Sequence, residues 1–237
     1  MEKPKTIGTP QCSILLTILT WGSLWGIFEA TVGYLLHLLP FSIGWLVWYP
    51  TACFFMLNVY RKTQRRSSVI LVGLLSASIK MLNLFLPGRI DRVLNPSVSI
   101  VFEALSMAAV VWVISHFLAN RGKGVSTKAL AALCMNTGWR GLYILYILFL
   151  VPDWMREISV ISSPQAFFTF FLIHNLSTSL VLFMGAIFSK YILAPINVME
   201  QKLALLFSAF SYGRAVGIKF IVVVCLLGSG IALELLL

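Results

Sequence analysis

The stretch from Ser97 to Ala119, SVSIVFEALSMAAVVWVISHFLA, decides the fold class of this chain. Apart from His116 near its end, Glu103 is its single ionisable acid or base, and most of the other residues are apolar. A helix of about 20 mainly apolar residues is long enough to cross the hydrocarbon core of a bilayer. The whole chain is 59% hydrophobic and 11% charged, which leaves too little polar surface for a water-soluble fold. We therefore expect a membrane protein.

Similar apolar runs recur along the chain. Seven candidate spans are Ser13 to Leu39, Phe41 to Tyr60, Ser68 to Leu86, Ser97 to Ala119, Ala129 to Val151, Gln165 to Ile192 and Val216 to Leu237. These runs do not alternate apolar and polar residues as strands of a membrane β-barrel do. The sequence predicts an all-α, polytopic transmembrane helical bundle of six to seven spans, with residues 1–192 forming a six-span unit and residues 216–237 a seventh helix.

Basic residues gather in alternate connections between the spans. Arg61, Lys62, Arg65 and Arg66 follow the second span, and Arg121, Lys123 and Lys128 follow the fourth. Basic loops remain in the cytoplasm, so we expect a cytoplasmic amino terminus and an outside carboxyl terminus. The net charge of +10 then reflects topology and contact with anionic membrane lipid rather than nucleic-acid binding. The expected location is a cell membrane that the chain crosses several times.

Residues 193–215 do not fit a span. Asn197 and Glu200 have the spacing of a helix capping box, and the apolar residues after them alternate with polar ones. We interpret this segment as a short amphipathic helix on the cytoplasmic face of the membrane. It is either a linker that partitions into the interface or a docking surface for a partner, and the sequence favours neither.

Five ionisable residues lie inside five different spans: Glu29, Lys80, Glu103, Arg140 and His174. A charge near the middle of a membrane helix costs at least about 2.5 kcal/mol, so such residues persist when they line a cavity or pair with each other. Helical phase places small or polar residues on the same face as each of the first four, and polar residues directly follow His174. The sequence therefore predicts a polar pocket within the membrane.

The expected depth of these residues places the pocket in the outer half of the bilayer, with Glu103 about two turns from the outer surface. Trp139, Tyr143 and Tyr146 flank Arg140, whereas most other aromatic residues are expected in the interfacial belts. The predicted substrate-binding residues are Glu29, Lys80, Asn83, Glu103, Arg140, Tyr143, His174 and Asn175. The structural alternative is a set of buried ion pairs, Glu29 with Arg140 and Lys80 with Glu103.

Small residues form a second pattern on the first span. Gly22, Gly26 and Ala30 recur every four residues, which allows another helix to approach closely. Ordinary packing inside the bundle is one interpretation. Docking of another subunit is the other.

Signals of catalysis are missing from the sequence. No HExxH motif or phosphate-binding glycine loop occurs, and the three histidines are scattered. The four cysteines have no paired or ligand-like spacing. We expect no enzyme activity, no cofactor and no metal site, and energised transport would require ATPase partners.

Three sequence segments carry a family resemblance: WGIFEATVGYLLHLLP from Trp25 to Pro40, IKMLNLFL from Ile79 to Leu86 and NPSVSIVFEAL from Asn95 to Leu105. With the general pattern of the first six spans, they resemble the substrate-binding S components of energy-coupling factor transporters. The resemblance implies a bundle of typically six helices in a bacterial or archaeal inner membrane. It also implies a vitamin or related micronutrient as solute, and a transmembrane coupling subunit that Gly22, Gly26 and Ala30 would contact.

The chain departs from this family in two ways. It has almost no first outside loop, because only Leu39, Pro40 and Phe41 separate the first two spans, and it has an extra seventh span. We expect a membrane-embedded subunit that binds a small polar solute for uptake. The alternatives are a proton-coupled secondary transporter that works alone, a membrane enzyme acting on a lipid-linked substrate, and a structural assembly factor.

Overall fold

The computed structural model describes residues 10–37, 44–85, 90–117, 124–208 and 212–236. No strand occurs within these ranges, and the predicted all-α class is confirmed. The helices are α1 (Pro10–His37), α2 (Gly44–Thr63), α3 (Arg66–Met81), the 3-10 turn η1 (Leu82–Phe85), α4 (Asp91–Phe117), α5 (Val125–Leu150), α6 (Asp153–Arg156), α7 (Pro164–Phe168), the π-helical turn η3 (Thr169–Ile173), α8 (His174–Ile187), α9 (Ser189–Ser208) and α10 (Tyr212–Leu236).

Five helical segments are long and apolar enough to cross a membrane: Arg66–Phe85, Asp91–Phe117, Val125–Leu150, Pro164–Ile187 and Val216–Leu233. They match the third to the seventh predicted spans. The first predicted span contains a shorter apolar helix, Ser13–Glu29, within the described residues. The second, α2, is helical as expected but falls outside this set, because Asn58, Arg61 and Lys62 lower its hydropathy.

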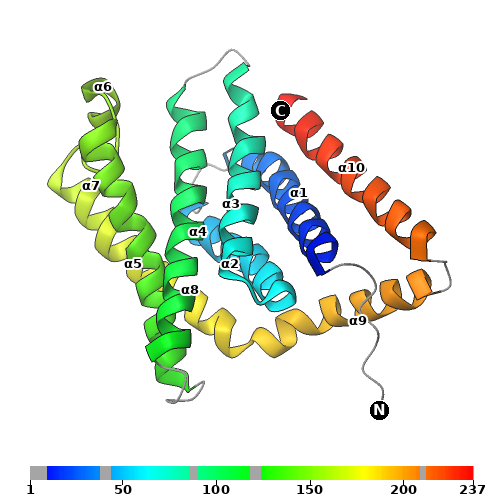
Figure 1. Cartoon of the computed structure of the whole chain (residues 1–237). Coiled ribbons are helices and arrows are strands. Elements are labelled where there is room, and N and C mark those ends of the chain that lie inside the picture. Colours follow the sequence, from blue (N-terminus) through cyan, green and yellow to red (C-terminus); the bar gives the residue numbers. More distant parts are fainter. Residues whose placement is uncertain (1–9, 38–43, 86–89, 118–123, 209–211, 237) are drawn as a thin grey trace.

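The long helices form a bundle around one apolar core. Figure 1 shows α3, α4 and α5 standing side by side, with α1 and then α10 on one flank and α7 to α8 on the other. The most extensive contacts join α3 with α4, α1 with α10 and α4 with α5. Trp25, Tyr49 and Met56 are among the fully buried side chains of this core. The side chains of α2 therefore reach the centre of the bundle.

Basic helix ends collect at one end of the bundle. The turn from α2 to α3, the start of α5 and the whole of α9 lie at the lower end in Figure 1. The described basic residues in these segments are Arg61, Lys62, Arg65, Arg66, Lys128, Lys190 and Lys202. The start of α1 lies toward the same end, and the last turn of α10 lies at the other. This arrangement has the alternation that the charge pattern predicts, while the side that faces the cytoplasm stays a prediction.

The α9 helix crosses the lower end of the bundle and is longer than expected (Figure 1). It begins at Ser189, so the sixth predicted span ends at Ile187 and the interfacial segment starts earlier than residue 193. Asn197 and Glu200 lie in the middle of this helix, and the predicted capping box is wrong. Both residues instead contact α2: Arg61 Nη2 donates to Asn197 Oδ1 at 3.4 Å, and Lys62 Nζ lies 2.8 Å from Glu200 Oε1.

Candidate functional site

Arg140 is the most deeply buried cation of the described chain, with 1% of its surface exposed. Its guanidinium carbon lies 4.7 Å from the centre of the Trp139 ring and 4.5 Å from that of Phe170. Nε donates to Asn136 Oδ1 at 3.3 Å, and Nη1 donates to the carbonyl of Phe170 at 2.9 Å. Among the described residues no carboxylate lies within ion-pair distance of Arg140, and Nη2 makes no hydrogen bond. The hydrogen bonds and ring contacts of this cation are therefore all with neutral groups.

The Phe170 carbonyl belongs to the π-helical turn η3. A π-helical turn widens the helix and breaks the regular i to i+4 hydrogen-bond pattern, and such turns are frequent at functional sites. Arg140 of α5 reaches into this turn of the neighbouring helix. The irregular backbone and the buried cation are therefore found together.

Asn136 lies one turn before Arg140 and joins α5 to α8. Its Oδ1 also accepts from Trp139 Nε1 at 2.8 Å, while its Nδ2 donates to the Asn175 carbonyl at 2.7 Å and to Ser179 Oγ at 3.0 Å. The side-chain amide of Asn175 in turn donates to Thr137 Oγ1 at 2.9 Å. Asn175 was predicted to contact the solute, and the structure places its side chain in this interhelical network.

Glu103 is the most buried acid of the described chain, with 5% of its surface exposed. It interacts electrostatically with Arg140 and with Glu29. Within the described ranges, however, its carboxylate makes no hydrogen bond and has no cation within 4 Å. The register of α4 on α5 explains its position, because Ser106 Oγ, one turn away, donates to the Met135 carbonyl at 2.7 Å. Glu103 therefore faces the interior at the level of Arg140.

The helix that carries Glu103 starts earlier than the predicted span. Helix α4 begins at Asp91 rather than Ser97, so Glu103 follows the helix start by 12 residues, or about 18 Å. The helix continues for a similar distance beyond it, to Phe117. Glu103 lies near the centre of α4, because Pro96 is accommodated inside the helix, and its depth in a bilayer stays a prediction.

The structure adds Tyr49 of α2 to this cluster. Its side chain is 1% exposed, and its ring lies 5.6 Å from that of Trp139. Its hydroxyl is buried and makes no hydrogen bond to nitrogen or oxygen in the described chain. The polar groups with which it interacts are the thiol of Cys53, one turn further along α2, and the charges of Glu103 and Arg140. We define the inner cluster as Tyr49, Cys53, Glu103 and Arg140.

Sequence reasoning missed Tyr49. In the sequence it is the middle residue of the tripeptide Trp48-Tyr49-Pro50 near the start of a span, where aromatic residues of the interfacial belt are common. Only the packing of α2 against α3, α4 and α8 brings it to the centre. The burial of its hydroxyl is a tertiary property that no local pattern predicts.

The other predicted residues surround the inner cluster at greater exposure. Glu29 is half-buried on α1 and accepts a hydrogen bond from Trp25 Nε1 at 3.1 Å. Lys80 and Asn83 are half-buried near the end of α3 and in η1. The ion pairs of the structural alternative, Glu29 with Arg140 and Lys80 with Glu103, are not formed. The two most buried charges are thus not explained as halves of ion pairs.

His174 and Tyr143 flank the cluster with aromatic contacts. The His174 ring stacks on the ring of Trp45, with centroids 4.0 Å apart and planes 9° from parallel, and His174 interacts electrostatically with Arg140. Tyr143 is buried, and its ring lies 5.9 Å from the rings of both Tyr146 and Phe170. The predicted aromatic surroundings of Arg140 are present.

The glycines of α1 face the interior of the bundle. A Cβ atom on Gly22 would lie 2.5 Å from Leu75 Cδ2, and one on Gly26 would lie 2.8 Å from Ile79 Cδ1. Helix α3 therefore covers the face that was predicted to dock another subunit, and internal packing is the correct interpretation for these two residues. The surroundings of Ala30 lie outside the described side chains.

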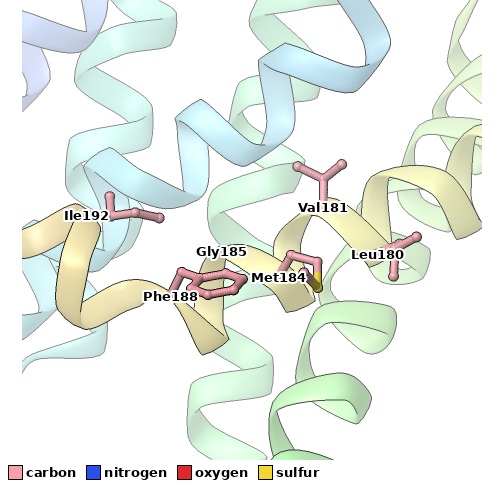
Figure 2. A pocket seen from close by; sticks show the side chains of 6 residues that line it. All are labelled: Leu180, Val181, Met184, Gly185, Phe188 and Ile192. Carbon is pink, nitrogen blue, oxygen red and sulfur yellow. The ribbon is translucent and has the colours of Figure 1, made fainter.

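A shallow apolar groove lies apart from the charged cluster. Figure 2 shows its lining at the bend between α8 and α9: Leu180, Val181, Met184, Gly185, Phe188 and Ile192. None of these residues is charged or belongs to the predicted site. In the described part of the chain, no group of three or more His, Cys, Asp or Glu residues is arranged to hold a metal ion.

Comparisons of the chain with models of known protein families, with curated proteins and with solved structures found no match.

Proposed function

We propose that this chain is a membrane-embedded subunit of an uptake transporter and binds a small polar solute at the inner cluster. The observation that carries the proposal is the state of its two most buried charges. Glu103 and Arg140 interact electrostatically, yet no ion pair joins them. Charges inside a membrane bundle are rare and expensive, and those that are kept mark functional sites.

The energetic argument favours a ligand over a purely structural role. A buried ion pair repays the cost of desolvation only with close contact and further hydrogen bonds. Arg140 has hydrogen bonds to neutral groups, and Glu103 has none to described residues. Arg140 then meets an anionic group of the solute, and Glu103 meets a cationic or donor group. His174, Lys80 and Glu29 extend the polar surroundings away from the inner cluster.

The transporter assignment rests on the resemblance of the first six spans to S components. That resemblance implies a membrane coupling subunit with ATPases as partners, and the sequence has no phosphate-binding loop of its own. Because α3 covers Gly22 and Gly26, the surface for such a partner lies elsewhere on the chain.

The test is solute binding by matched variants. Native mass spectrometry of the purified chain identifies a co-purified solute, and calorimetry measures its affinity. Glu103→Gln and Arg140→Gln are each expected to weaken binding at least about tenfold, because truncating one partner of a desolvated charge contact costs 2–5 kcal/mol. Glu157→Gln and Arg156→Gln remove the same charges at the solvated end of α6 and serve as controls.

Two outcomes contradict the proposal. One is the absence of any bound or transported solute in membranes that contain the chain. The other is unchanged affinity in both inner-cluster variants when size-exclusion chromatography shows that each is folded. Co-purification of a second membrane protein with ATPases would support the transporter assignment.

The second candidate is a proton-coupled secondary transporter. The observation in its favour is Glu103 itself, a buried carboxyl without a hydrogen-bond partner in the described chain. Such a group can accept and release a proton during transport. Uptake by the chain alone in liposomes, driven by a pH gradient and abolished by Glu103→Gln, would identify this mechanism. Uptake that needs ATPases would exclude it.

A further inference from the structure

The inner cluster has three polar ends that form no hydrogen bond to a described nitrogen or oxygen. They are the carboxylate of Glu103, Nη2 of Arg140 and the hydroxyl of Tyr49, from α4, α5 and α2, and the Tyr49 hydroxyl is fully buried beside the thiol of Cys53. Resting on the proposed function, we propose that the solute is a small zwitterion. Its anionic group lies at Arg140, its cationic group lies at Glu103, and Tyr49 donates a hydrogen bond to it.

One edge of the Arg140 guanidinium group is available to a ligand. The Trp139 and Phe170 rings lie close to the guanidinium, and Nε and Nη1 already donate to protein oxygens. Nη2 is left, and a charge-assisted hydrogen bond from it to a carboxylate is about twice as strong as a neutral one. The fixed guanidinium therefore selects a compact anionic group.

While Glu103 is ionised, a ligand with both charges suits the inner cluster better than a ligand with one. Glu103 and Arg140 are both desolvated, so an anion bound at Arg140 alone would leave the carboxylate of Glu103 without a counter-charge. A cation bound at Glu103 alone would leave the guanidinium in the same state. Glu29 and Lys80 add one further acid and one further base at half-buried positions, so the balance of the region stays neutral. A molecule with both charges meets both requirements.

A substitution at Tyr49 can distinguish contact with the solute from a purely structural role of this side chain. Its hydroxyl makes no hydrogen bond to nitrogen or oxygen in the described chain, while its ring packs on Trp139. Tyr49→Phe keeps the ring and removes a buried hydroxyl whose nearest polar neighbour in the described chain is the thiol of Cys53. The folded state should lose little by this change, because a thiol is only a weak hydrogen-bond partner. A loss of binding in this variant would therefore report contact with the solute.

Each comparison in the experiment is between molecules that have the same number of carbon atoms but different charges. Glycine, β-alanine and γ-aminobutyrate are each measured by calorimetry beside the carboxylic acid and the amine of the same carbon count. At least one zwitterion is expected to bind ten times more tightly than both of its matched compounds. Glu103→Gln should reduce this advantage over the acid, and Glu157→Gln should leave it intact.

The tyrosine variant completes the test. Tyr49→Phe should weaken binding of the preferred zwitterion about tenfold with an unchanged unfolding temperature, whereas Tyr191→Phe on the exposed face of α9 should change neither. A matched acid or amine that binds as tightly as the zwitterion overturns the proposal, as does failure of all three zwitterions. A co-purified solute with a single charged group would overturn it and leave the proposed solute binding standing.

Discussion

Single side chains show how the bundle holds a cation that forms no ion pair within the described chain. Arg140 is stabilised by two aromatic faces and two neutral oxygens. Cation–π contacts reach about 2 kcal/mol when both groups are desolvated. The guanidinium is therefore fixed in one orientation before any ligand arrives.

Asn136 is the residue on which this orientation depends. Its side chain accepts from Trp139 and Arg140 and donates to two groups of α8. We predict that Asn136→Ala lowers the free energy of unfolding by about 1–3 kcal/mol, because buried donors lose their acceptor. Thermal unfolding in detergent measures the effect, and Gln201→Ala at an exposed position of α9 is the control. Equal unfolding temperatures for the two variants would contradict the role given to Asn136.

The charged residues of the site were readable from the sequence, because a charge in a long apolar run stands out on its own. Arg140 and Glu103 were predicted in this way and are the most buried pair. Tyr49 was not predicted, since an aromatic residue near a span end is ordinary. Asn175 was assigned to the solute, because a polar residue on an inner face gives no sign of which group will satisfy it.

Pairs of helices depend on close backbone approach at a few positions. Helix α3 meets α4 at Gly73, where a Cβ atom would lie 2.5 Å from Ala104 Cβ and 3.5 Å from the Ile100 carbonyl oxygen. Neither of these atoms can rotate away. The two helices must therefore separate to admit any side chain at this position.

We predict that Gly73→Ala destabilises the bundle by about 1–3 kcal/mol, the usual cost of overpacking a well-packed interior. The gain in helix propensity, about 1 kcal/mol at most, opposes this cost. Gly217→Ala in α10 is the matched control, because no other atom lies within 4 Å of its added Cβ. A Gly73→Ala protein that unfolds at or above the temperature of the control would show that α3 and α4 can move apart freely.

Helix α9 is held to the bundle by polar contacts from the end of α2. The Lys62–Glu200 ion pair is about one-third exposed, and Lys62 Nζ also lies 5.5 Å from the centre of the Trp21 ring. An ion pair with this exposure is worth at most about 1 kcal/mol. The attachment of α9 is therefore weak enough to be changed by one residue.

We predict that Glu200→Lys increases hydrogen exchange in residues 189–208, because two lysines then face each other. The reversed pair, Lys62→Glu with Glu200→Lys, should restore protection. Glu157→Lys changes the charge by the same amount far from α9 and should have no effect on its exchange. Unchanged exchange in the single variant would mean that apolar contacts such as that of Leu193 hold α9 by themselves.

At the scale of the whole molecule, α1 is enclosed. Helices α2, α3 and α10 all pack against it, and α10 forms the second most extensive helix contact in the structure. The seventh helix is thus part of the bundle. This enclosure is the physical reason why Gly22 and Gly26 cannot serve a partner as the family resemblance implies.

The distribution of basic residues predicts the orientation of the bundle. We expect the end that carries α9 to face the cytoplasm and α6 to face outside. Single cysteines at Gln201 and at Glu157, in a chain whose four cysteines are replaced by alanine, test this with a membrane-impermeant maleimide. Glu157→Cys should react in intact cells, and Gln201→Cys only after permeabilisation. The reverse pattern would invert the topology.

The all-α class, the position of most apolar helices and the charges inside them can be read from the sequence. These properties follow from the composition and spacing of residues that are close in the chain. Contacts between distant helices are needed to show that Glu103 and Arg140 are not paired, that Tyr49 joins them, that α3 covers Gly22 and Gly26, and that Asn197 and Glu200 contact α2. Each of these depends on the register between helices far apart in the sequence, and local periodicity does not contain that register.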